Sequence, residues 1–172
     1  MADALARIAP LTGLGMILLR ADPARSGTAI AAALAMDLPD RGQSSTAGAR
    51  RLCWMSPDEW LLVLPAAQTD EALRDLEAAL AGQFALVLDV SDMRVAFAIE
   101  GPRATQVLAK LSPADLRALP EDAVRRTRAA QVACAIWREG DRLVVIGFRS
   151  VGEYLAGLLA GAARPGSQLD PR

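Results

Sequence analysis

The sequence predicts an α+β protein built from two tandem copies of a ferredoxin-like unit, each with the element order strand–helix–strand–strand–helix. Two pairs of matching landmarks indicate the duplication: Pro23 and Pro102 are 79 positions apart, and Cys53 and Cys134 are 81 apart. Self-similar segments at a nearly constant spacing are typical of a repeat. The element order within each copy is the split βαβ arrangement. With 172 residues, 52% of them hydrophobic, the chain is able to bury a core.

The first copy opens with an apolar strand and a helix. The strand covers 16–21 and leads to Pro23, whose missing N–H costs nothing in the first turn of a helix. The Ala-rich helix that follows is expected to end near Met36. The next stretch, 37–50, is rich in Gly, Ser and Thr, which predicts a mobile loop.

A hairpin and a second helix complete the first copy. Apolar segments at 53–55 and 60–64 flank a polar turn and predict two paired strands. Thr69 is the predicted N-cap of the following helix, which has two acidic residues in its first turn. Leucines at helical spacing mark the buried face of this helix, at Leu73, Leu76 and Leu80.

The second copy opens in the same way. A strand over 95–100 leads through Pro102 into a helix that is expected to end near Leu111. The sequence at 112–115 then predicts the start of a short helix that runs through Leu119. Both copies therefore place a proline between an apolar strand and a helix.

A second hairpin and a capped helix end the second copy. The strands of this hairpin cover 134–137 and 143–146. Ser150 and Glu153 have the spacing of a capping box, in which each side chain bonds the backbone N–H of the other residue. The helix that they begin is expected to bury Tyr154, Leu155, Leu158 and Leu159.

The two copies meet at an apolar strand over 84–90. The turn at Ser91 and Asp92 joins this strand to the one that begins near Met93, which predicts a short hairpin. We therefore expect the halves of the chain to be connected by sheet pairing rather than by a linker.

This connection predicts a single domain. The halves, about 14–82 and 83–163, are expected to form one pseudo-two-fold domain over residues 1–163. The remaining residues, 164–172, contain two prolines and a glycine, and they predict a flexible tail.

Composition excludes several classes of partner. The formal net charge is −1, so no electrostatic argument supports binding to nucleic acid or to an anionic membrane. The basic clusters at 50–51 and 125–128 are typical of solvated loops. No apolar run approaches the roughly 18 residues that a membrane span needs. The first ten residues lack the apolar core of a signal peptide, and Cys53 and Cys134 are interpreted as free thiols, so we expect a cytoplasmic protein.

The sequence contains no recognisable combination of catalytic residues. It contains no histidine, which removes the commonest general base, the Ser-His and Cys-His nucleophile systems and imidazole metal ligands. Two isolated cysteines do not make a zinc or iron–sulfur site. The glycines of Gly13-Leu14-Gly15 precede a strand instead of linking a strand to a helix, so they do not form a dinucleotide-binding loop. We expect no catalytic residue, no bound cofactor and no metal in this chain.

Four residues are candidates for a pocket or an interface. Asp89 and Asp92 flank one turn and can face a common ligand, but aspartates at such positions also stabilise turns through bonds to nearby N–H groups. Trp54 and Trp60 flank the hairpin tip at 56–59, where they can stack on a ligand, pack in the core or form a protein interface. The acidic flanks of the tip argue against stacking on nucleic acid.

Two motifs give the chain a family resemblance. The segment W-M-S-P-D-E-W-L-L at 54–62 resembles the G-P-D-E-W-L type motif in the gamma subunit of heterotetrameric sarcosine oxidase. The segments D-V-S-D at 89–92 and G-P-R-A at 101–104, with a strand between them, resemble the D-V-S-D…G-x-x-A pattern of the same family. The resemblance extends from about Leu14 to Leu159.

The resemblance implies a fold and a function. The family is similar to the folate-binding domain of glycine-cleavage aminomethyltransferases, whose fold is a duplicated ferredoxin-like unit with exchanged first strands. It implies a complex with alpha, beta and delta subunits that oxidatively demethylates sarcosine to glycine and passes the one-carbon unit to tetrahydrofolate. FAD, FMN, NAD and folate then belong to the partner subunits. Arg103 stands where the aminomethyltransferases have an acidic residue, which implies a lost or repurposed folate pocket and adds Arg103 to the candidates.

Three functions therefore compete. A non-catalytic accessory subunit of sarcosine oxidase is expected to expose an apolar patch that only the complex covers. A free-standing folate-binding protein of one-carbon metabolism is expected to contain a concave, partly apolar pocket near the repeat axis. A ferredoxin-like regulatory module that binds an amino acid is expected to melt at a higher temperature with its ligand.

Overall fold

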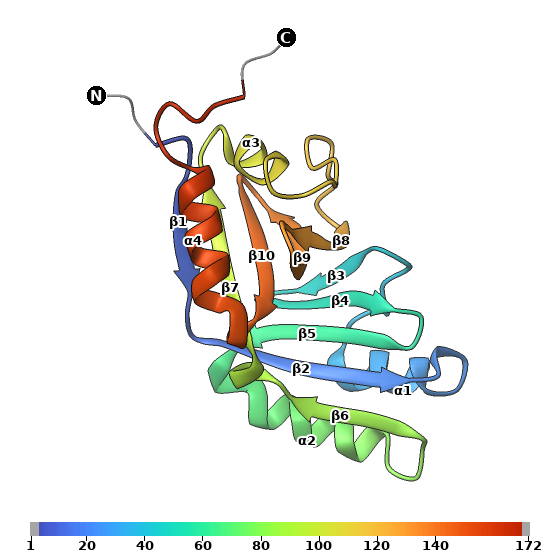
Figure 1. The fold of residues 1–172 in the computed structure, drawn as a ribbon. Helices are drawn as coiled ribbons and strands as arrows, with labels where there is room; N and C mark the ends of the chain where they lie inside the picture. The colour runs from blue at the N-terminus through green and yellow to red at the C-terminus, as the bar shows by residue number, and fades with distance from the viewer. Residues whose placement is uncertain (1–3, 170–172) are drawn as a thin grey trace. The chain divides into compact units, whose positions relative to one another are not determined.

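The computed structural model describes residues 4–169, whose contacts divide them into two compact units. The N-unit consists of residues 13–92, and the C-unit combines residues 4–12 with 93–169. Each unit contains one five-stranded antiparallel sheet, and helices connect some of its strands along the chain (Figure 1). The predicted α+β fold of duplicated ferredoxin-like units is confirmed. The single pseudo-two-fold domain over 1–163 stays a prediction.

The N-unit has the ferredoxin-like order β-α-β-β-α-β with one added strand, β3. Its sheet runs in the order β3-β4-β5-β2-β6. The elements are β2 (Leu14–Ala21), α1 (Pro23–Leu34), β3 (Ser44–Ala47), β4 (Arg50–Ser56), β5 (Glu59–Pro65), the 3-10 turn η1 (Ala66–Gln68), α2 (Thr69–Ala79) and β6 (Ala85–Asp89).

The core of the N-unit lies between its sheet and the helices α1 and α2. Side chains of a strand alternate between the two faces of a sheet, and Ile17, Leu19 and Trp60 project toward the helices. They pack there in one cluster with Ile30 and Leu76, and each of the five is at most 2% exposed. Burying one such side chain contributes roughly 1.5–3 kcal/mol.

The C-unit repeats this arrangement with the sheet order β1-β7-β10-β9-β8. Its core joins the sheet to α3 and α4 through buried side chains that include Ile99, Val107, Ile136, Val145 and Leu159. The elements are β1 (Arg7–Leu11), β7 (Arg94–Glu100), α3 (Ala104–Ala109), β8 (Val124–Ala129), β9 (Val132–Glu139), β10 (Arg142–Phe148), the 3-10 turn η3 (Arg149–Val151) and α4 (Gly152–Ala162).

The first strand of the chain completes the sheet of the second unit. β1 pairs antiparallel with β7, from Arg7 opposite Glu100 to Leu11 opposite Ala96. β6 pairs antiparallel with β2 at the same place in the N-unit. The C-unit thus takes its last ferredoxin strand from the N-terminus, which is the exchange that the family resemblance implies. The sequence pattern does not reveal β1, because Pro10 interrupts it.

The predicted hairpin between 84–90 and the strand from Met93 is wrong. β6 pairs with β2, whereas β7 pairs with β1 and β10, so the two strands lie in different sheets. Two hydrogen bonds keep the end of β6 on β2: Val90 N donates to Met16 O at 2.8 Å, and Met16 N donates to Ser91 Oγ at 2.9 Å. The 3-10 turn η2 (Ser91–Met93) then leads to β7, which has a strand on each side.

Three polar segments also differ from their predicted structure. Part of the predicted loop 37–50 forms β3 and pairs with β4. Both basic clusters lie in strands, β4 and β8, rather than in loops. The predicted short helix over 112–119 is absent. Ser112 Oγ and Asp115 Oδ1 instead accept hydrogen bonds from N–H groups two residues ahead, at 3.3 Å and 3.0 Å, which stabilises turns.

The helices α2 and α4 begin differently from the prediction. A 3-10 turn precedes each of them, and its i→i+3 bond satisfies the first N–H of the helix. Their N-caps are Gln68 and Val151, and neither makes a side-chain hydrogen bond. Thr69 is therefore the first residue of α2, and Ser150 forms no capping box. Tyr154 lies outside the core with 53% of its surface exposed, whereas the other side of each helix is buried as expected, at Leu76, Leu80, Leu155 and Leu159.

The C-terminal segment is hydrogen-bonded up to Ser167. Lys110, the only lysine of the chain, donates from Nζ to Ser167 O at 2.6 Å, to Ser167 Oγ at 2.9 Å and to Ala162 O. Partial burial lowers the pKa of Lys110. The end of the predicted flexible tail, 170–172, lies outside the described residues, and the flexibility of 164–172 stays a prediction.

Candidate functional site

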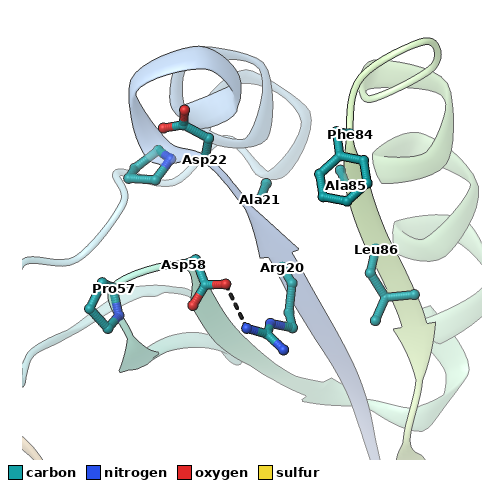
Figure 2. A pocket seen from close by; sticks show the side chains of 9 residues that line it. Arg20, Ala21, Asp22, Pro57, Asp58, Phe84, Ala85 and Leu86 are labelled. Atoms are coloured by element: carbon teal, nitrogen blue, oxygen red, sulfur yellow. Dashed lines mark hydrogen bonds and ion pairs between the residues drawn. The ribbon is translucent and has the colours of Figure 1, made fainter.

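A hollow of about 880 Å³ lies in the N-unit beside the end of β2 (Figure 2). Its walls come from the end of β2, the start of α1, the tip of the β4–β5 hairpin and the start of β6. A volume of this size is within the range of small-molecule sites. The hollow is lined by Arg20, Ala21, Asp22, Pro23, Pro57, Asp58, Phe84, Ala85 and Leu86.

An ion pair crosses the hollow between β2 and the hairpin tip. Arg20 Nη2 lies 2.6 Å from Asp58 Oδ2, as the dashed line in Figure 2 shows. The same strand is bonded to the tip through its backbone, because Ala21 N donates to Asp58 O at 3.0 Å. The hydrogen bond from Arg20 lowers the pKa of Asp58, and the same bond raises the pKa of Arg20. Both side chains are about half exposed, so water screens their attraction.

The start of α1 and the start of β6 are held in place by local hydrogen bonds. Pro23 is the first residue of α1, and Asp22 Oδ1 accepts a bond of 2.9 Å from the N–H two residues ahead. Ser26 Oγ of α1 donates to Gln83 Oε1 at 2.6 Å and so ties the helix to the segment before β6. Phe84 follows directly and is 99% exposed.

The hollow offers contact surface rather than reactive groups. Arg20 and Asp58 neutralise each other, and the lowered pKa of Asp58 makes it a weak base. Asp22 is engaged as a helix cap. The remaining lining consists of proline, alanine, leucine and phenylalanine, which suits an apolar or aromatic group of a ligand or partner. Nothing in this lining pairs a nucleophile with a base, as covalent catalysis requires.

The C-unit has a smaller hollow, of about 480 Å³, at the corresponding place of the repeat. It is lined by the strand–helix junction at Gly101 and Pro102 and by the β9–β10 hairpin tip at Asp141. Arg138 in its wall donates to the backbone oxygens of Leu119 at 3.2 Å and Leu116 at 3.3 Å. A hollow beside the strand–helix junction is thus a property of the repeated fold, and its presence alone does not identify a ligand.

The two tryptophan candidates lie in and against the N-unit core. Trp54 and Trp60 are opposite each other on β4 and β5. Trp60 is 2% exposed, and its Nε1 has no hydrogen-bond partner among the described residues. Trp54 is half-buried and packs against the same cluster. Neither lines the hollow. This placement is typical of core packing, and a role for either residue at a pocket or interface stays a prediction.

The charged candidates belong to different units: Asp89 and Asp92 to the N-unit, Arg103 to the C-unit. Asp89 ends β6 and stabilises its turn, because its Oδ1 accepts from Ser91 N at 2.9 Å and from Ser91 Oγ at 2.5 Å. Asp92 is exposed in the 3-10 turn that follows. Arg103 is exposed at the N-cap of α3 in the C-unit. β2 separates Asp89 from Trp60 on β5, and their partners on β2, Ile17 and Leu19, are two residues apart, so Asp89 and Trp60 lie roughly 12 Å apart. A shared ligand for these candidates stays a prediction.

Sequence reasoning misses the three residues that give the hollow its character, Arg20, Asp58 and Phe84. Arg20 is a charged residue in an apolar strand, and Asp58 is a charged residue in a hairpin tip. Their ion pair can be predicted only once the register between the two strands is known. The register places Arg20 opposite Glu59, next to Asp58. Phe84 has the pattern of a buried strand residue, and nothing in the sequence indicates its exposure.

Two kinds of site are not found in residues 4–169. No group of three or more His, Cys, Asp or Glu side chains is placed to hold a metal ion. None of the helices there combines the length and the apolar character that a membrane crossing requires.

Comparison with known sequences identifies one family. A sequence model of the "sarcosine oxidase, gamma subunit family" matches residues 19–163. The sarcosine oxidase subunit gamma of Arthrobacter sp is 35% identical over 130 residues, which are 72% of this chain and 63% of that protein. Its counterpart from Corynebacterium sp. (strain U-96) is 37% identical over 145 residues, 80% of this chain and 67% of that protein. The chain spans about two thirds of the length of these relatives.

Comparison with solved structures agrees with the sequence match. A chain of the heterotetrameric sarcosine oxidase from Corynebacterium sp. U-96, in complex with pyrrole 2-carboxylate, superimposes with a TM-score of 0.88 at 28% identity, covering 97% of this chain and 88% of that chain. The glycine cleavage system aminomethyltransferase T from Bartonella henselae gives a TM-score of 0.69 at 21% identity, covering 93% and 46%. The second match shows a common fold.

Proposed function

This chain belongs to the sarcosine oxidase gamma subunit family, and we propose that it acts as a non-catalytic accessory subunit of a heterotetrameric sarcosine oxidase. In this proposal the complex oxidatively demethylates sarcosine to glycine and transfers the one-carbon unit to tetrahydrofolate. The observation that carries the proposal is the superposition on a chain of the heterotetrameric enzyme, with a TM-score of 0.88 over 97% of this chain.

The surface of the chain supports a role in assembly. Large apolar side chains are exposed in both units, and in each unit three of them come from one short stretch of the chain. Exposed apolar surface of this kind is typical of regions that a partner covers. The exposed fractions are 99% for Phe84, 45% for Leu86 and 43% for Leu88 in the N-unit, and 42% for Phe148, 36% for Val151 and 53% for Tyr154 in the C-unit.

We place the cofactors FAD, FMN, NAD and tetrahydrofolate in the alpha, beta and delta subunits. Gly13 and Gly15 come nearest to a phosphate-binding loop in this sequence. They support this assignment, because the packing of side chains explains why position 15 is a glycine. Gly15 lies within β2, where a Cβ would be only 1.9 Å from Thr69 Oγ1. Its small size is therefore needed for the approach of α2, and no bound phosphate is required to explain it. We also propose a cytoplasmic location, in keeping with the two free cysteines.

Isolation of the tagged chain from its native cell tests this proposal. We expect three further chains to accompany it, with the visible absorbance of flavin and with activity on sarcosine. A lone, colourless chain would contradict the proposal, and titration with tetrahydrofolate would then decide whether the protein binds folate alone. A protein that instead melts at a higher temperature with one free amino acid would indicate a regulatory module.

A further inference from the structure

The two sheets of residues 4–169 have four edge strands, and three of these carry features that discourage pairing with another chain. β1 contains Arg7 and Pro10, β3 is short and polar, and β8 includes three exposed arginines. Charge, proline and short length are the usual protections of a sheet edge. β6 is the exception, because its sequence Ala-Leu-Val-Leu-Asp contains no proline and no basic residue, and the exposed Phe84 precedes it. Figure 1 shows β6 at the outer side of β2 in the N-unit.

The backbone of β6 has hydrogen-bonding groups that point away from its sheet. Val90 N donates to Met16 O at 2.8 Å, so this pair faces inward. In an antiparallel ladder the bonded pairs recur at every second residue, so positions 86 and 88 also face β2. Among the strands of residues 4–169, β6 pairs only with β2. The N–H and C=O groups directed away from β2 therefore belong to Ala85, Val87 and Asp89.

Apolar side chains lie on both faces of this edge. Leu86 and Leu88 project on one face, 45% and 43% exposed. On the other side, a shallow hollow of about 260 Å³ runs between β6 and α2, lined in part by Leu80, Val87 and Glu77. A further strand beside β6 would cover both surfaces with its alternating side chains.

The charged side chains of the segment that contains β6 are all acidic, and Arg20 on the neighbouring strand is paired with Asp58. From position 75 to 93 the sequence contains four acidic residues and neither lysine nor arginine. Glu77 borders the shallow hollow, and Asp89 ends the strand. An occupant with a basic residue at either place would gain a complementary charge.

From these features we propose that β6 is the docking edge for an extended segment of a partner subunit, which adds to the N-unit sheet as a sixth strand. The segment carries apolar side chains at alternating positions and a Lys or Arg where it passes Glu77 or Asp89. Main-chain bonds to Ala85, Val87 and Asp89 supply the affinity, and the side-chain pattern supplies the selectivity. This inference rests on the proposed function, because it takes the occupant from the sarcosine oxidase complex.

Proline substitution at outward-facing positions tests the edge. Val87→Pro removes an N–H that points away from β2, so it blocks an added strand without removing a bond to β2. Thr46→Pro is the matched control on β3, the opposite edge of the same sheet. Trp54 N donates to Gln43 O, and the same alternation turns the N–H of Thr46 outward. A second variant, Leu86→Lys with Leu88→Lys, adds charge to the exposed face and leaves the backbone intact. Circular dichroism and melting establish that each variant folds.

The readout is the flavin that accompanies the tagged chain from its native cell. We expect Val87→Pro and the double lysine variant to lose about tenfold or more of the bound flavin, as truncation of a central contact does, and Thr46→Pro to retain it. Unchanged flavin in both β6 variants would overturn the inference and leave the proposed function standing. A wild-type chain isolated without flavin would contradict both. A dimer of the isolated chain that Val87→Pro dissociates would assign the edge to a second copy and also overturn the inference.

Discussion

The two units bring the same two elements together but place the necessary glycine on opposite sides of the contact. In the N-unit the glycine is on the strand, because a Cβ on Gly15 of β2 would lie 1.9 Å from Thr69 Oγ1 at the start of α2. In the C-unit it is on the helix, where a Cβ on Gly152 of α4 would lie 3.2 Å from Cγ2 of Val95 in β7. The repeat thus preserves a close approach between strand and helix. This close approach requires a glycine at one of the two contacting positions, and the glycine can be on the strand or on the helix.

The largest effect is expected from Gly15→Ala, which removes the small residue of the N-unit pair. The added methyl group overlaps Thr69 Oγ1 and comes within 3.2 Å of Thr69 Cβ, so the Thr69 side chain must rotate or β2 and α2 must move apart. Overpacking of this kind costs typically 1–3 kcal/mol. Urea unfolding measures the loss. Gly152→Ala is the comparison, and we expect a smaller loss because only a valine side chain has to give way.

A second substitution is expected to restore the stability of Gly15→Ala. Thr69→Gly transfers the small residue to the helix and reproduces the arrangement of the C-unit. The double variant should regain most of the stability that Gly15→Ala loses, and the interaction in this double-mutant cycle should be about 1 kcal/mol or more. Additive effects of the two substitutions would show that the contact between them is not the cause.

The units differ next in their buried tryptophans. Trp60 Nε1 has no partner among the described residues, whereas Trp137 Nε1 donates to Glu139 Oε1 at 2.8 Å, and both side chains are at most 2% exposed. Replacement by phenylalanine removes the same atoms in each case, but only Trp137→Phe also breaks a hydrogen bond. We expect Trp137→Phe to cost about 1 kcal/mol more than Trp60→Phe in the free energy of unfolding. An equal loss would contradict this difference.

These comparisons show how much of the molecule the sequence can predict. Apolar strands that lead through a proline into a helix are local patterns, and they predict the repeat correctly. The exchange of β1 depends on pairing between residues about 90 positions apart, which no local pattern encodes; it is expected only from the family resemblance. The wrong hairpin after β6 has the same origin, because a short turn between two apolar strands does not specify which sheet each strand joins.

The candidate site was less predictable than the fold for a related reason. Asp89 and Asp92 stand out in the sequence because they flank a turn, and Asp89 stabilises that turn. The hollow at Arg20 and Asp58 exists only because the register of β2 and β5 brings a strand end next to a hairpin tip. The exposure of Phe84 likewise depends on the packing around it, and a strand-like sequence gives no sign of it.

The buried cysteine in the core of the C-unit leads to a pH-dependent prediction. Burial raises the pKa of Cys134 from 9.0 to about 11. The unfolded chain therefore releases this proton near pH 9 while the folded chain retains it, so stability falls as the pH rises from about 9 to about 11 and is unaffected by this thiol below that range. Melting curves at several pH values should show a steeper fall for the wild type than for Cys134→Ala. Parallel pH profiles would contradict the raised pKa.

The smallest effect is expected in α4, which has glycines in its interior where α2 has none. A Cβ on Gly157 would meet no atom within 4 Å. Gly157→Ala should therefore stabilise the protein by about 0.5–1 kcal/mol, because alanine loses less backbone entropy in a helix. Gly140 in the β9–β10 turn has equally open surroundings but a φ of +56°, which a side chain disfavours. Gly140→Ala should destabilise for this reason, so opposite signs in thermal unfolding would separate backbone conformation from available space, and equal signs would refute that distinction.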